Sequence, residues 1–415
     1  MKKESILPRG MTRRDLLRAG LYGLGVAGLS AAPLPPMFGR VASALAAQGG
    51  ESERIFVVFE VSGGNDGLNT VVPYGDDAYY RQRPKLGIRP DRLRKLDDHF
   101  GLNDGMAGFE RLYKDGRLAI VHGCGYENPS FSHFTSMAYW HTAAPNSGSE
   151  YGWMGRLADS MLPAGTPNAM INVAATQSLA VRSRDHVPVV FDEPDKFARE
   201  GFFQERPIFD RAGGGAHSAN PSRRFLHEIA QSAKDASLLV KDAWSRYRSP
   251  VDYGIVSYDL DKVAALIEAG MPTRLYYTGV RNNAFDTHVF QANLHGRLLT
   301  YVSDAVSGFL RDMERIGRAD DVVVLLFSEF GRRVPENTNL GTDHGAAGLM
   351  FVAGKPVRGG HYGDPPSLTD LDEGDNLVFT TDFRRVYATV IDGWLGYKAA
   401  PELLGGEFEP FPMFA

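Results

Sequence analysis

The chain has 415 residues, of which 43% are hydrophobic and 23% are charged, and its formal net charge at pH 7 is −5. This composition is typical of a folded globular protein, and the length suits one large α/β domain or two average ones. The negative charge gives no electrostatic reason to bind nucleic acid or an anionic membrane. The single cysteine, Cys124, excludes an intramolecular disulfide and zinc–thiolate sites, so that a metal site must use His, Asp, Glu or hydroxyl ligands.

The first 46 residues have the pattern of a targeting segment. Arg13 and Arg14 form a twin-arginine signature, an apolar stretch covers residues 21–33, and residues 44–46 make a small-x-small cleavage site. The apolar stretch is shorter than the ~20 residues that a membrane span requires, although an N-terminal anchor is the alternative interpretation. We expect twin-arginine export to the periplasm or the exterior, removal of the segment, and no stable membrane insertion. The mature chain then has a net charge of −10, because the segment holds seven basic and two acidic residues.

The remaining residues, 47–415, are predicted to form a single α/β domain with a mostly parallel sheet. Continuous apolar runs rich in β-branched residues predict buried strands, at residues 54–61, 117–123, 169–173, 187–191, 274–280, 322–327 and 349–354. Helical patterns follow or separate these runs, at residues 153–162, 222–248, 260–269, 289–318 and 381–397. The segment over residues 205–270 is predicted to be a helical insertion or a cap over one side of the sheet.

The strand over residues 54–61 leads into a glycine-rich turn that holds Asp66. Asp66 lies just past the carboxyl end of this strand, where ligands bind in open α/β sheets. An ordinary Asn-Asp-Gly turn is the alternative, and the GxGxxG spacing of a dinucleotide site is absent. In the polar segment over residues 74–116, we expect side chains such as Tyr79 and Arg83 to lie on the surface.

A further helix is predicted to begin at Ser130 or Ser132. A serine hydroxyl at this position can cap the helix. Alternatively, it can face an anion that the helix dipole and the free amides already attract. Both interpretations stay open, and the second makes Ser132 a candidate nucleophile or anion anchor with His133 beside it.

Two later strands also end in side chains that can bind a metal. Asp286 and His288 lie between a predicted strand and the long helix, and Glu329 follows the strand over residues 322–327. Because the carboxyl ends of parallel strands meet at one edge of a sheet, we expect these groups to lie close together. His295, two helical turns after His288, fits a structural residue better than a functional one.

Beyond Glu329, the pair Asp343 and His344 arrives in a glycine-flanked loop. Carboxylate and imidazole ligands suit divalent ions, here zinc, calcium, magnesium or manganese. Two ions ~4 Å apart would clamp an in-line displacement and activate the hydroxyl of Ser132. The guanidinium of Arg332 would then neutralise oxygens of an anionic substrate.

These motifs resemble the family of exported proteins that carry domain of unknown function 1501. The resemblance extends over the whole mature chain. It is carried by the twin-arginine segment and by five motifs, Gly63–Asn69, Ser132–Phe134, Phe285–His288, Ser328–Arg332 and Gly341–Gly345. The activity of that family is not established, so this resemblance implies motifs and export rather than a reaction.

More distantly, the chain resembles the alkaline phosphatase and sulfatase superfamily. That resemblance implies a doubly wound α/β sandwich with metal ions at the strand ends. It also implies roles for Asp66, Ser132, Asp286, His288, Glu329 and His344. The sequence departs from the superfamily in two places, because Glu329 replaces an Asp and Phe330 stands where His or Asn would bind a second ion. No Cys/Ser-x-Pro-x-Arg motif is present, which argues against a formylglycine sulfatase.

The sequence therefore predicts an exported, metal-dependent hydrolase of phosphate or sulfate esters, acting on an anionic small molecule or glycan. The predicted catalytic residues are Ser132, His133 and Arg332, and the predicted metal ligands are Asp66, Asp286, His288, Glu329, Asp343 and His344. A non-catalytic exported protein that binds metal or glycan is the alternative. A third possibility is a maturation partner of another exported protein, with residues 222–269 as its docking surface.

Overall fold

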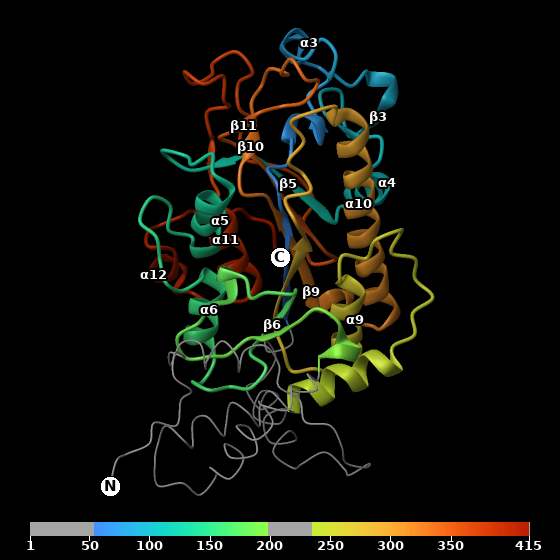
Figure 1. Ribbon diagram of the computed structural model, residues 1–415, viewed down its shortest axis with the longest axis vertical. Coiled ribbons are helices and arrows are strands. Elements are labelled where there is room, and N and C mark those ends of the chain that lie inside the picture. The colour runs from blue at the N-terminus through green and yellow to red at the C-terminus, as the bar shows by residue number, and fades with distance from the viewer. Residues whose placement is uncertain (1–53, 198–234, 415) are drawn as a thin grey trace, which may run out of the picture.

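The computed structural model describes residues 54–197 and 235–414 (Figure 1). The predicted export signal and the first part of the helix predicted over residues 222–248 lie outside the described residues. In the part of the chain that is described, no helix is both long and apolar enough to cross a membrane.

A nine-stranded sheet forms the centre of the molecule. Its strands, in spatial order, are β13 (Gly360–Tyr362), β5 (Leu118–Gly125), β12 (Gly348–Ala353), β9 (Val322–Phe327), β1 (Ile55–Val61), β8 (Leu275–Val280), β6 (Met170–Val173) and β7 (Val189–Phe191), and β14 (Thr381–Asp382) pairs with β5. Every pairing is parallel except the two that β12 makes. The predicted, mostly parallel sheet is confirmed.

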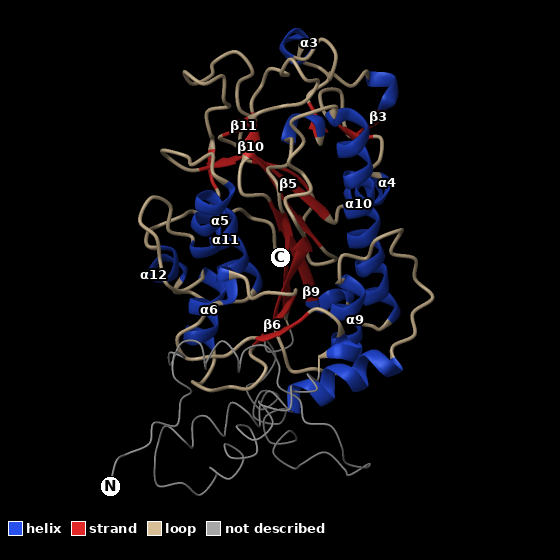
Figure 2. Ribbon diagram, viewed as in Figure 1, coloured by secondary structure: helices blue, strands red, loops and turns tan. Residues whose placement is uncertain are grey.

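Helices cover both faces of this sheet (Figure 2). One face is packed by α4 (Ala107–Lys114), α9 (Leu260–Glu268) and α10 (Gln291–Arg315), and the other by α5 (His133–Thr142), α6 (Trp153–Met161), α11 (Arg384–Ala388), a π-helical turn (Thr389–Trp394) and α12 (Ala400–Leu404). Alternate side chains of β1 enter the two cores, because Phe59 faces the first and Phe56 the second. Each such burial contributes about 1.5–3 kcal/mol. The fold is therefore a doubly wound α/β sandwich, as predicted.

The described part of the predicted insertion joins the main core. Residues 235–246 are helical, and Val240 packs in the same cluster as Val263 of α9 and Phe309 of α10. The last predicted helix, over residues 381–397, is less regular than expected, since it comprises the end strand β14, α11 and the π-helical turn.

A smaller layer covers the carboxyl edge of the sheet. It contains a three-stranded sheet and short helices, namely β2 (Val71–Val72), β4 (Gly101–Asn103), β3 (Leu93–Lys95), α3 (Asp77–Gln82) and the 3-10 turns Gly67–Asn69 and Pro90–Arg92. The expectation that Tyr79 and Arg83 lie on the surface is wrong, because both side chains are buried. Arg83 pairs with Asp66 at 2.6 Å and donates to the carbonyl oxygen of Val334. Neither partner is a sequence neighbour, so no local pattern indicated this burial.

Candidate metal centre

Four loops meet at the carboxyl edge of the sheet. Three of them follow β1, β8 and β9, and the fourth precedes β12, whose reversed direction brings its first residue to this edge. Two short strands join the last two loops: β10 (Gly331–Arg332) pairs with β11 (His344–Gly345), with Arg332 opposite His344. The segment before α5 reaches the same place, since the carbonyl oxygen of Phe131 lies 2.7 Å from His344 Nδ1.

Three imidazole rings surround the carboxylate of Asp286. The Nε2 atoms of His288 and His344 lie 3.0 and 3.1 Å from Asp286 Oδ1, and His133 Nε2 lies 3.4 Å from Oδ2. His133, Asp286 and His344 offer ligand atoms that all lie within 4.8 Å of one another. The structure therefore brings together four residues that the sequence selected as site residues.

The tautomers of two of these rings follow from their surroundings. His288 Nδ1 lies 3.1 Å from Asp343 Oδ1, and His344 Nδ1 lies 2.7 Å from the carbonyl oxygen of Phe131. A carboxylate and a carbonyl only accept hydrogen bonds, so both Nδ1 atoms carry the proton. Burial lowers the pKa of His344, which favours its neutral form.

The two Nε2 atoms lie 3.0 Å from each other and 3.0 and 3.1 Å from Asp286 Oδ1, a set of contacts that a shared proton or a metal ion between them would satisfy. Two ligands of a tetrahedral zinc ion lie about 3.3 Å apart when the zinc–nitrogen distance is about 2.05 Å. The Nε2 and carboxylate separations around Asp286, between 3.0 and 3.4 Å, are close to that spacing. The residues present therefore fit a divalent ion.

Glu329 holds the third ring, that of His133. Its carboxylate is fully buried and lies 2.7 Å from His133 Nδ1, and it accepts hydrogen bonds from the backbone amide of Gly63 and from Ser328 Oγ. The hydrogen bond to Glu329 raises the pKa of His133. Gly63 has a φ of 120°, and a Cβ at this position would lie 2.5 Å from the backbone nitrogen of Asp286. Glu329, predicted as a direct ligand, thus faces the imidazole and the loop after β1.

The centre is open to solvent. The side chains of Asp286 and His288 are 32% and 37% exposed. Burial raises the pKa of Asp286, but the hydrogen bonds from Arg332 and His344 outweigh it and lower the pKa to about 2. A carboxylate that is ionised at every ordinary pH and reachable from solvent is available to a cation.

Arg332 and Phe330 both have structural contacts beside the centre. The buried guanidinium of Arg332 donates to the carbonyl oxygens of Gly63, Gly64 and Thr342 and to Asp286 Oδ1, at 2.5 to 2.8 Å. It ties the loops together, whereas the prediction gave it to a substrate anion. Phe330 is buried, and its ring centroid lies 4.9 Å from that of His133 and 4.5 Å from that of His344.

Asp66 lies apart from these groups. Its buried carboxylate is bound by Arg83, by the side-chain amide of Gln291 and by the backbone amide of Asn69. The reason is local, because Asp66 is the N-cap of the 3-10 turn that begins at Gly67. Burial raises the pKa of Asp66, but the charge of Arg83 reverses the shift and the pKa is lowered. The structure therefore pairs Asp66 with Arg83 and does not bring it to the imidazoles.

Ser132 stands beside the centre with its hydroxyl uncommitted. It is the N-cap of α5, is exposed, and makes no capping hydrogen bond through its side chain. The capping interpretation is therefore wrong for this serine. Its chain neighbours Phe131 and His133 both contact the imidazole cluster, through the carbonyl oxygen and the ring respectively.

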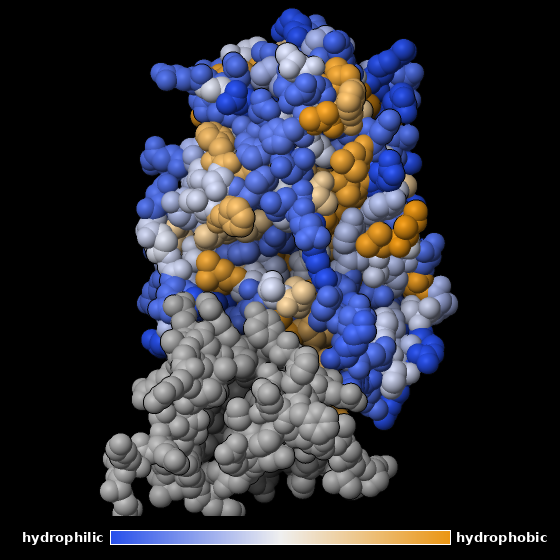
Figure 3. Space-filling model, in the orientation of Figure 1, coloured by the Kyte–Doolittle hydropathy of each residue, from blue (hydrophilic) through white to orange (hydrophobic). Residues whose placement is uncertain are grey.

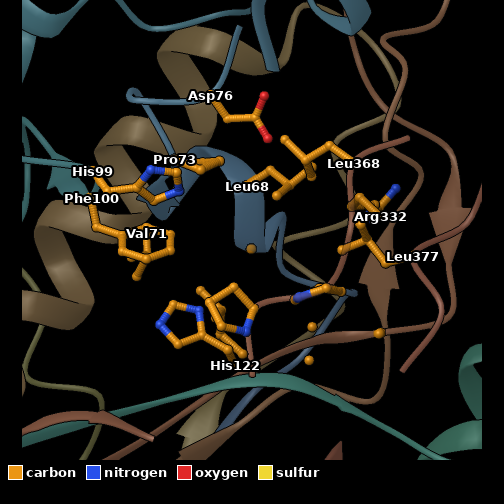
Figure 4. Close-up of a pocket in the computed structure, with 17 residues that line it drawn as sticks. Leu68, Val71, Pro73, Asp76, His99, Phe100, His122, Arg332, Leu368 and Leu377 are labelled. Atoms are coloured by element: carbon orange, nitrogen blue, oxygen red, sulfur yellow. The ribbon is translucent and has the colours of Figure 1, made fainter. Parts of the chain in front are cut away.

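Sequence reasoning missed a second histidine pair. His122, on β5, lines a pocket together with His99, Phe100 and Arg332 (Figure 4). Its Nε2 lies 2.7 Å from Nδ1 of His361, and burial, followed by the charge of His361, lowers the pKa of His122 to about 3. Two histidines 239 residues apart carry no joint sequence signal. The roles of the Phe131 carbonyl and the Gly63 amide were also invisible, because backbone groups are common to all residue types.

Residues 266–386 match the model of a protein family described as "Protein of unknown function (DUF1501)". The predicted resemblance to DUF1501 is confirmed over these residues. The matched segment includes Asp286, His288, Glu329 and His344 of the centre, whereas His133 and Ser132 lie before it. No curated protein matches the sequence significantly.

Several solved structures have a similar fold at low similarity. A sulfatase from Pseudoalteromonas sp. is 10% identical, with a TM-score of 0.38, over 92% of this chain and 75% of that chain. The lipoteichoic acid synthase LtaP from Listeria monocytogenes is 10% identical, with a TM-score of 0.35, over 94% and 79%. A TAB5 alkaline phosphatase variant with bound Mg is 7% identical, with a TM-score of 0.34, over 75% and 94%. At these values the likenesses carry no argument about the activity of this chain.

Proposed function

We propose that this protein is an exported, metal-dependent hydrolase of phosphate or sulfate esters. One observation carries the proposal: three imidazole Nε2 atoms face the carboxylate of Asp286, and each ring is anchored through its Nδ1 atom. Metal-binding histidines characteristically donate their other N–H to a carboxylate or carbonyl oxygen, which fixes the ring and its tautomer. The twin-arginine pattern supports a periplasmic or secreted location.

The donor set favours zinc among the ions that the sequence left open. Imidazole nitrogens suit zinc, whereas magnesium and calcium prefer oxygen ligands throughout. His133, His344 and Asp286, whose ligand atoms lie within 4.8 Å of one another, would hold the ion, and Glu329 would orient His133. His288 lies beside Asp286 and His344 as a further candidate ligand. A bound divalent ion would supply Lewis-acid polarisation of an ester oxygen.

The start of α5 supplies the other half of the chemistry. The first-turn N–H groups of a helix have no intrahelical acceptor, and the positive end of the helix dipole favours an anion there. In this helix of 10 residues, the hydroxyl of the N-cap residue Ser132 makes no capping hydrogen bond. We assign Ser132 as the nucleophile, with the ester anion held between the amides of α5 and the imidazole cluster.

A second candidate is a non-catalytic protein that binds a metal or a glycan. Two observations favour it. Phe330 packs against two of the imidazole rings, and Arg332 spends its donors on carbonyl oxygens and Asp286. Four protein ligands would fill the coordination sphere of a tetrahedral zinc ion, as in structural zinc sites, and would leave no position for a substrate.

The deciding experiment measures metal content and ester turnover on the same preparation. Protein purified without chelators is analysed by elemental mass spectrometry, reconstituted with zinc, manganese, magnesium or calcium, and supplied with aryl phosphates and aryl sulfates. We expect about one zinc per chain and turnover that Ser132→Ala abolishes while zinc content is unchanged. Failure to bind any of the four metals would refute the proposal. Zinc binding without turnover would instead favour the second candidate.

A further inference from the structure

Hydrophobic side chains border the metal centre on two sides. Five large apolar residues near it are exposed, and we call them the hydrophobic rim: Phe131 (40%), Phe134 (89%), Val289 (51%), Phe290 (72%) and Leu294 (44%). Single exposed apolar residues are common, but a group gathered at one place marks a binding surface. Only four other large hydrophobic residues in the described ranges are comparably exposed.

The rim is fixed in place by the centre itself. Phe134 follows His133 in α5, and Val289 follows His288 before α10. Leu294 lies in the first turn of α10, and Phe290 is the N-cap residue directly before that helix. In Figure 3, hydrophobic surface lies above the start of α5 and over the start of α10, with a hydrophilic strip between the two. The starts of the two helices next to the rim residues thus show hydrophobic surface on either side of a hydrophilic strip.

Electrostatics alone would hold an anionic ester only weakly here. Asp286, Glu329 and Asp343 bring three negative charges to the centre, and Arg332 and the nearby Arg333 bring two positive ones. A divalent ion would leave a surplus of a single positive charge, in a chain whose net charge is −5. Binding energy from the non-reacting part of the substrate is thus needed, and such energy also supports catalysis.

We propose that the substrate is an amphiphilic ester, in which an alkyl or aryl group packs on the hydrophobic rim while the anionic head enters the imidazole cluster. This inference rests on the proposed function, since it names the substrate class of the same site. The negative charge of the chain disfavours an anionic membrane as the occupant. The polar strip between the two areas of hydrophobic surface suits one small molecule with a charged end better than a continuous apolar partner.

The test compares ethyl and hexyl phosphates and ethyl and hexyl sulfates, whose leaving alcohols have nearly equal intrinsic reactivity. Release of inorganic phosphate or sulfate by the zinc-loaded full chain gives kcat/KM for each ester. We expect kcat/KM for the hexyl ester to be at least about tenfold higher, because four additional methylene groups leave water at up to about 0.8 kcal/mol each, which sets an upper limit of about 200-fold. The double variant F134A/F290A should reduce this preference to about twofold. The control is Ile255→Ala, which removes an 81% exposed side chain next to Gly254, beside the middle of α10.

Each outcome decides the matter. Equal kcat/KM for ethyl and hexyl esters in the wild type would overturn the amphiphile inference while leaving the hydrolase proposal intact. A preference that survives in F134A/F290A, or that I255A also loses, would overturn the assignment to the rim. The amphiphilic-substrate inference would also be overturned if the wild type binds neutral lipid vesicles, F134A/F290A loses this binding, and neither protein prefers the hexyl ester.

If no ester is hydrolysed, the proposed function fails, and calorimetry with ethyl- and hexylphosphonate then judges the rim separately. Tighter binding of hexylphosphonate that F134A/F290A abolishes would support the rim. Equal affinity for the two phosphonates would overturn it.

Discussion

Removing the charge of Glu329 tests how the imidazole of His133 is held. In Glu329→Gln, the amide oxygen can still accept from His133 Nδ1 and the Gly63 amide. The new NH2 group can donate to Ser328 Oγ, which keeps its own bond to the carbonyl oxygen of Val61. The fold is thereby conserved, and what is lost is a charge-assisted hydrogen bond. Such a bond contributes about 1.5–3 kcal/mol, compared with about 0.5–1.5 kcal/mol for a neutral one.

The difference of about 1 kcal/mol corresponds to a five- to tenfold loss of zinc affinity. Glu329→Ala removes the acceptor altogether, so its zinc affinity should fall by about 100-fold, at the upper end of the range for residues that support metal ligands. It should also lower the free energy of unfolding by about 1–3 kcal/mol, because buried donors are left unsatisfied. Zinc affinity is measured by competition with a chromogenic chelator, and stability by urea unfolding of the metal-free protein.

The matched control is Asp312→Asn. Asp312 is also fully buried and accepts hydrogen bonds from Tyr253 and Ser249, but it lies on α10 away from the centre. This variant should lose stability and keep its zinc affinity. Wild-type zinc affinity in both Glu329 variants would show that Glu329 does not orient a metal ligand, and would remove the main argument for His133 in the centre.

Three further predictions follow from single contacts. Ser132→Ala should lower kcat by at least about 10³-fold at unchanged zinc content; a smaller effect would exclude it as the nucleophile. Arg83→Met leaves the buried carboxylate of Asp66 without its ion-pair partner, so the free energy of unfolding should fall by about 3–5 kcal/mol in urea titrations, with zinc affinity unaffected if Asp66 is not a ligand. Burial lowers the pKa of His295 to about 4, so the unfolded chain gains this proton first and stability falls as the pH drops from 6.5 to 4. The expected loss is about 3 kcal/mol, and His295→Gln, measured by urea unfolding at both pH values, should remove most of it.

The sequence predicted the strands well because their burial is continuous. The run from Val322 to Phe327 is fully buried, as expected from its composition, and so is most of β1. The same property hid the direction of β12. A strand buried on both faces shows an apolar run whether it is parallel or antiparallel, so nothing in residues 348–353 indicated that this strand alone is reversed.

The sequence predicted the candidate ligands of the site, but it did not predict the residues that bind and orient these ligands. Asp286, His288 and His344 stood out because acids and histidines follow strands. The sequence did not show which carboxylates belong to the metal centre and which have a structural role. Asp66 and Asp286 both follow a buried strand, yet one is bound by Arg83 and the other faces the imidazoles. That difference depends on a partner 17 residues away and on loops more than 200 residues away, which only the folded chain brings together.

The position of Arg332 suggests how the centre is assembled during folding. Its guanidinium bonds the loop after β1 through Gly63 and Gly64, the loop before β12 through Thr342, and the loop after β8 through Asp286. Those loops carry the Gly63 amide that donates to Glu329, the ring of His344 and the central carboxylate. Because one buried cation satisfies carbonyl oxygens from all three, the centre forms only when the three loops have docked. A metal ion would then bind to a preorganised set of ligands and would not have to gather the loops itself, which reduces the ordering cost of binding.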